Sequence, residues 1–203
     1  MKSDTNLASN GLSPGEEILG AAGLPALTWF GRGDPKRPLI LFVPGVRHLA
    51  RIAYGAHEGA RAEDFLAHHF GVRGFSFAGV SYPTDPAEGG IPTAHPGFTV
   101  RDWGRMLADV AGQLIAREGL GREVWVMTWS MSGKVAQSAH VAMREAGLTM
   151  PGLIAVTATA PLPGFKASGG ISPWRPTAMR WERAIRHRAM PRSRSATRRR
   201  VGR

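Results

Sequence analysis

Cysteine is absent from this chain of 203 residues, so disulfide bonds and thiolate metal sites are excluded. No run of apolar residues approaches the ~18 that a membrane-spanning helix needs, so the sequence predicts no membrane span. The polar segment 1–10 also lacks the apolar core of a secretory signal. We therefore expect a cytoplasmic protein, and the sequence suggests neither a cofactor nor a metal ion.

Acidic residues are scarce only toward the C-terminus. Residues 174–203 hold eleven arginines and one glutamate, a net charge of +10, out of +11 for the whole chain. Residues 1–173 hold 15 basic and 14 acidic residues and are almost neutral. Such a charge block is typical of a solvated, disordered extension, so no specific nucleic-acid partner is expected.

The chain is long enough for one well-buried domain with tails. Residues 1–25 are small, polar and rich in glycine, and they predict a flexible lead-in. A core is expected over 26–165. After Pro161 the apolar pattern ends, and 166–203 is expected to be a basic, arginine-rich tail without order.

Short apolar runs alternate with segments of helical periodicity in the core. Strands are predicted at 26–30, 38–43, 75–80, 124–129 and 153–159, and helices at 58–70, 99–118 and 133–146. Thr99 and Asp102 have the spacing of a capping box at the start of the middle helix. Alternating strands and helices predict an open, mostly parallel sheet with helices on both faces, an α/β fold.

The segment TWSMSG, residues 128–133, lies between a predicted strand and a predicted helix. A serine nucleophile must be exposed, and a tight strand-to-helix turn achieves this only with small residues two positions before and after it. Thr128 and Ser132 hold those positions around Ser130. Ser132 is the poorer candidate, because Lys134 would then stand where a small residue is needed. Ser130 is the predicted nucleophile.

Two backbone N–H groups are expected to stabilise an oxyanion near Ser130. Met131 opens the helix after the turn, and its N–H points toward the space above the serine. The second donor is expected from the loop after the strand at 38–43, and Val46 is the residue we select.

The stretch from Pro38 to Pro161 resembles the α/β-hydrolase family in order and spacing. The segments that carry the resemblance are PLILFVPG, FTVRDWGRMLADVAGQLI and VWVMTWSMSGKVA. The last of these is similar to the family's Gly-Trp-Ser-Met-Gly-Gly elbow, with Thr128 and Ser132 in place of two glycines. The resemblance implies a serine hydrolase that acts on a small ester, amide or thioester through Ser130.

The acid and the histidine that this family places after the serine are not identified. No aspartate follows Asp109, and the only histidines after Ser130 are His140 and His187. His140 is expected roughly 15 Å along the helix that leaves the turn. Arginines surround His187 and would disfavour the imidazolium that a general base must form. His48 and His95 lie in loops, at positions that do not match the family's histidine.

Three interpretations therefore remain open. The chain is a serine hydrolase, weak or inactive as given; a non-catalytic α/β-hydrolase-like fragment or binding module; or a nucleic-acid binder with a basic tail. The missing C-terminal part indicates a truncated or frame-shifted hydrolase, or a divergent member of the family. The sequence leaves the substrate and the oligomeric state open.

Overall fold

The computed structural model describes residues 11–160 except 56, 58 and 84–94. Its elements, in chain order, are β1 (Glu16–Ala21), β2 (Leu24–Gly31), β3 (Leu39–Val43), α1 (Arg51–Tyr54), η1 (Ala62–Asp64), α2 (Leu66–Gly71), β4 (Ser76–Ser81), α3 (Val100–Glu118), β5 (Val124–Trp129), η2 (Ser130–Val135), α4 (Ala136–Glu145) and β6 (Leu153–Val156). The arginine-rich segment 166–203, for which a tail is predicted, lies outside the described residues.

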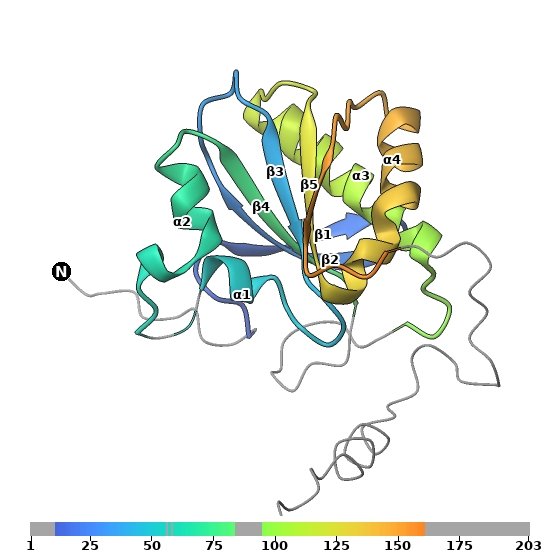
Figure 1. Ribbon diagram of the computed structural model, residues 1–203, viewed down its shortest axis with the longest axis horizontal. Helices are drawn as coiled ribbons and strands as arrows, with labels where there is room; N and C mark the ends of the chain where they lie inside the picture. The colour runs from blue at the N-terminus through green and yellow to red at the C-terminus, as the bar shows by residue number, and fades with distance from the viewer. Residues whose placement is uncertain (1–10, 56, 58, 84–94, 161–203) are drawn as a thin grey trace, which may run out of the picture. The chain divides into compact units, whose positions relative to one another are not determined.

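One sheet of six strands organises the described residues, in the order β1-β2-β4-β3-β5-β6 (Figure 1). The strands β4, β3, β5 and β6 pair in parallel, and β1 and β2 extend the sheet by antiparallel pairing. The predicted parallel pairing of the strands at 38–43 and 124–129 is confirmed, with Val43 beside Thr128. The fold is an open, mostly parallel α/β sheet, as the sequence predicts.

Helices cover both faces of this sheet (Figure 1). Ile40 and Phe42 of β3 point to one face, where they pack with Ala53 and Tyr54 of α1 and with Ala67 of α2. Since alternate residues of a strand point to opposite faces, the buried Leu39, Leu41 and Val43 point to the other. There α3 lies against β1, β2 and β3, and α4 packs on α3. All five residues of β3 are buried, because both faces are covered.

The helix α3 has the ends that its sequence predicts. The Thr99 hydroxyl accepts the Asp102 N–H at 3.2 Å, and the Asp102 carboxylate accepts the Thr99 N–H at 3.0 Å. The Thr99 hydroxyl also donates to the Asp102 carboxylate at 2.6 Å, and this bond together with that from the Thr99 N–H lowers the pKa of Asp102. At the other end Gly119 adopts φ +67°, a left-handed conformation that glycine tolerates without strain.

The flexible lead-in predicted over 1–25 is wrong for residues 16–21, which form β1. This strand pairs with β2 across the two residues Ala22 and Gly23. Glu16 holds it in place: its fully buried carboxylate accepts hydrogen bonds from Arg51 at 2.6 Å and from Tyr54 at 2.6 Å. A pairing partner and a buried ion pair therefore order a segment whose composition is that of a loop.

Three predicted elements differ in extent. The helix expected at 58–70 is reduced to η1 and α2, because Phe65 between them is extended, at φ −119° and ψ 147°. The helix expected at 133–146 begins earlier, with the 3₁₀ turns of η2. The strand expected at 153–159 ends at Val156, since Thr157 adopts φ +44°.

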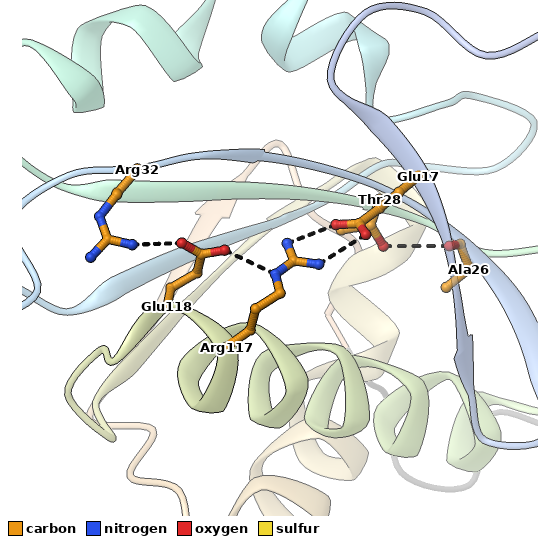
Figure 2. A network of polar contacts seen from close by, with 6 residues as sticks. All are labelled: Glu17, Ala26, Thr28, Arg32, Arg117 and Glu118. Atoms are coloured by element: carbon orange, nitrogen blue, oxygen red, sulfur yellow. Dashed lines mark hydrogen bonds and ion pairs between the residues drawn. The ribbon is translucent and has the colours of Figure 1, made fainter.

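Ion pairs join the C-terminal end of α3 to the antiparallel edge of the sheet (Figure 2). Arg117 binds Glu17 of β1 through two nitrogens, at 2.8 and 2.9 Å, and Glu118 at 2.9 Å. Glu118 also accepts a hydrogen bond from Arg32 at 2.6 Å.

Within the described residues, the structure contains no helix with the length and apolar character of a membrane span.

Candidate active site

Ser130 lies at the junction between β5 and η2, where the predicted strand-to-helix turn is present. Trp129 before it is extended, at φ −123° and ψ 132°, whereas Ser130 adopts φ +56°. A left-handed conformation costs a non-glycine residue about 1–2 kcal/mol. The change from an extended to a left-handed backbone makes the chain turn sharply at Ser130, which is half-buried. This turn lies at the carboxyl end of the parallel strands.

The loop after β3 lies against this serine. A Cβ placed on Gly45 would lie 2.9 Å from Ser130 Cβ and 3.3 Å from Ser130 Oγ. Only glycine therefore allows so close an approach at this position. Val46, the predicted oxyanion donor, follows directly, and Met131, the other predicted donor, is the second residue of η2. The first N–H groups of a helix have no acceptor within that helix.

The loop after β3 is held in place by two hydroxyl groups, those of Ser81 at the end of β4 and of Tyr82 directly after it. Tyr82 is buried, and its hydroxyl donates to the Gly45 carbonyl at 3.1 Å and accepts from the Arg47 N–H at 3.3 Å. Burial raises the pKa of Tyr82 to about 12, more than the Arg47 N–H lowers it, so this group stays neutral. Ser81 accepts the Ala50 N–H at 2.8 Å.

Ser132, the poorer nucleophile candidate, is fully buried. Its hydroxyl accepts the Trp129 N–H at 2.8 Å and lies 2.9 Å from the carbonyl oxygens of Val43 and Trp129, to which it donates its one proton. It therefore joins the end of β3 to the end of β5, and it is not accessible to substrate.

The segment after β6 also contacts the turn at Ser130. Thr159 donates its N–H to the Ser130 carbonyl at 2.8 Å. A Cβ on Gly133 would lie 2.4 Å from the Thr159 carbonyl oxygen, so this position requires glycine. The partner in this close approach is the chain that leaves β6.

Comparisons with known proteins agree with this topology. No protein-family model and no curated protein matches the sequence. Among solved structures, the esterase Est22 is similar at a TM-score of 0.50 and 14% identity, over 71% of this chain and 45% of that one. The chain has an α/β-hydrolase fold.

Two further structures with this fold are similar. A bacterial heroin esterase gives a TM-score of 0.49 at 19% identity, over 76% of this chain and 47% of that one. A thermophilic esterase of Thermogutta terrifontis gives 0.46 at 16% identity, over 71% and 46%. The chain thus spans less than half the length of these α/β-hydrolase structures.

Thr128, which stands where the resemblance expects a small residue, is fully buried in β5. Its hydroxyl has no hydrogen-bond partner among the described residues. An unpaired buried hydroxyl costs about 1–3 kcal/mol, so threonine fits this turn of the α/β-hydrolase fold at a cost in stability.

The histidines lie at different distances from the turn. The His48 ring packs edge-on against the Trp129 ring, with centroids 4.9 Å apart, next to Ser130. His95 accepts the Gly97 N–H on Nδ1 at 3.2 Å, so its neutral form carries the proton on Nε2. His140 lies on α4, the helix that leaves the turn, as predicted, and it is exposed there. His187 lies outside the described residues.

No cluster of three or more potential metal-ligating histidine, aspartate or glutamate side chains occurs within the described ranges. Sequence reasoning missed the roles of Tyr82, Ser81 and Ser132. The first two directly follow the predicted strand at 75–80, and a polar pair at the end of a buried strand was the available signal. Ser132 was considered as a small residue and as the poorer nucleophile candidate, whereas its hydroxyl forms structural hydrogen bonds.

Proposed function

We propose that the chain acts as a serine hydrolase, with Ser130 as nucleophile toward an ester, amide or thioester of a small molecule. The observation that carries this proposal is the left-handed Ser130 at the end of a parallel strand, with Gly45 packed against its side chain. A serine in an ordinary helix cap has an extended backbone and needs no such contact.

In this proposal the Ser130 hydroxyl attacks the carbonyl carbon, and the N–H groups of Met131 and Val46 stabilise the oxyanion. Each donor of this kind contributes about 3–4 kcal/mol in acyl transfer. The similar structure Est22 is that of an esterase, which supports an ester as the first substrate class to test.

A fluorophosphonate probe tests the assignment directly. We expect slow modification of Ser130, located by peptide mass mapping, in the full chain. Ser130→Ala should abolish the adduct, and Ser132→Ala should retain it, provided that circular dichroism shows a folded variant. An unmodified Ser130 after prolonged incubation, or equal labelling of Ser130→Ala, would favour a non-catalytic α/β-hydrolase-like binding module.

A further inference from the structure

A groove between α3 and α4 is separate from the residues around Ser130. It has a volume of about 480 Å³, within the range of small-molecule sites. The two helices approach closely beside it, since a Cβ on Gly104 would lie 2.7 Å from Ser138 Cβ. The Ser138 hydroxyl donates to the Val100 carbonyl at 2.8 Å and ties the helices together. The walls of the groove are therefore fixed by packing.

Cations line one part of this groove. Arg101 and Arg105 are four residues apart on α3 and so point from one face of the helix. Lys134 of η2 and the Gln137 amide of α4 line the opposite wall. Glu145, eight residues beyond Gln137, is the one acidic lining residue. Three cations and one acid leave the lining with a net charge of +2.

The nearby carboxylate of Asp102 lies within ion-pair distance of Arg105 and offsets part of this positive charge. The separation of 3.9 Å is beyond hydrogen-bond distance. One of its oxygens is already engaged by the Thr99 N–H and hydroxyl. The Arg105 guanidinium is more than half exposed. It therefore retains donors for an anion.

The remaining lining is apolar. Val100 of α3 and Val141 and Ala142 of α4 also line the groove. Positions 134, 137, 141 and 145 follow the helical spacing that puts them on one face, so the apolar surface lies between the cationic part and Glu145. A bound molecule would meet positive charge at one end and hydrocarbon along its length.

We propose that this groove binds a small amphipathic anion, with a phosphate or carboxylate head on Arg101 and Arg105 and a short apolar chain over Val100 and Val141. The guanidinium fork matches both head groups in geometry. Glu145 limits the length of the chain and disfavours a second negative group at the far end.

The test is a titration of the full chain that is monitored by 1H–15N NMR. Residue-specific amide shifts distinguish binding in the groove from binding to the arginines of 174–203. The probes are n-hexyl phosphate, hexanoate, inorganic phosphate and n-hexyltrimethylammonium. We expect amide shifts at Arg105, Gln137 and Val141 with both hexyl anions, tighter binding of n-hexyl phosphate than of inorganic phosphate, and no binding of the ammonium. Comparison of the affinities for n-hexyl phosphate and hexanoate shows whether the groove prefers a phosphate or a carboxylate head group.

Arg101→Gln together with Arg105→Gln should weaken n-hexyl phosphate binding at least about tenfold, because two charge-assisted contacts are lost. Arg144→Gln removes the same kind of charge from α4 outside the groove, and binding should change less than about twofold. If the double variant fails to fold, Gln137→Glu supplies the repulsive substitute. Equal binding in the double variant, or shifts confined to 174–203, would overturn the proposal.

Discussion

Ser130 combines a strained backbone with a hydroxyl that no described group visibly deprotonates. His140 is exposed on α4, and His95 holds its Nδ1 toward Gly97. A hydrolase that lacks a member of its triad retains only what oxyanion donors and binding supply. We therefore expect the surroundings of this serine, and not its position, to limit its reactivity.

We expect the chain to hydrolyse p-nitrophenyl acetate only weakly, so that Ser130→Ala removes no more than a small excess over the buffer rate. The measurement is the rate in excess over buffer, with His140→Ala as the control. Robust turnover that His48→Ala, His95→Ala or His187→Ala abolishes would show that one of these residues is the base.

Thr128 offers a prediction about stability at the same turn. Thr128→Val replaces an unpaired buried hydroxyl by a methyl group and should raise the free energy of unfolding by about 1 kcal/mol. Thr28→Val is the matched control, because the equally buried Thr28 hydroxyl donates to the Ala26 carbonyl at 3.4 Å (Figure 2). Urea unfolding should show the control unchanged or less stable. A destabilised Thr128→Val would mean that its hydroxyl has a partner.

At the scale of elements, β1 depends on one buried carboxylate. Burial alone would raise the pKa of Glu16, but the hydrogen bonds from Arg51, Tyr54 and the Ser13 N–H outweigh it and lower the pKa below the ordinary 4.5. Burial and the neighbouring carboxylate raise the pKa of Tyr54, which keeps its proton as donor. The ionised form of Glu16 is thus favoured by folding.

Glu16→Gln should destabilise the chain by about 3 kcal/mol, because the mostly buried Arg51 loses the charge of its Glu16 partner. Glu17→Gln, one residue along, breaks a half-exposed pair with Arg117 (Figure 2) and should cost less than about 1 kcal/mol. Urea unfolding at neutral pH measures both.

The lowered pKa of Glu16 also predicts how the folding stability depends on pH. The contribution of Glu16 is complete above its unfolded pKa near 4.5 and is lost as the pH falls through the folded value. The difference in stability between the chain and Glu16→Gln should therefore shrink below pH 4.5. A constant difference would contradict a charged Glu16.

Elements with strong local signals were predictable from the sequence. The runs at 39–43 and 76–81 are buried on both faces, and the run at 124–129 is mostly buried. The capping box at Thr99 fixes the start of α3. β1 was not predictable, because its order comes from β2 and from Arg51, which is 35 positions away from Glu16. For the site, the turn at Ser130 followed from small residues, whereas the Tyr82 contact with Gly45 joins separate loops, so local spacing does not identify Gly45 as the partner.

At the scale of the whole molecule, charge and fold are separated along the sequence. Nearly all of the net charge of +11 belongs to 174–203, and the residues before it are almost neutral. Non-specific affinity for nucleic acid depends on cations that displace counterions, so it should depend on the last thirty residues.

We expect the full chain to bind duplex DNA at low salt without sequence preference, and the affinity to fall steeply as salt rises. Removal of residues 174–203 should abolish this binding in an electrophoretic shift assay. A preferred sequence, or binding retained by residues 1–173, would instead support a specific nucleic-acid site in the remainder.

The sheet order also has a consequence for how the chain is synthesised. Val43 of β3 pairs with Thr128, which follows it 85 positions later, whereas β1 and β2 are joined through two residues. At about 5–20 residues per second, a ribosome leaves one edge of β3 unpaired for roughly 4–17 s. During that interval the fully apolar strand β3 has an unpaired edge in the nascent chain. A chaperone would bind at this stage.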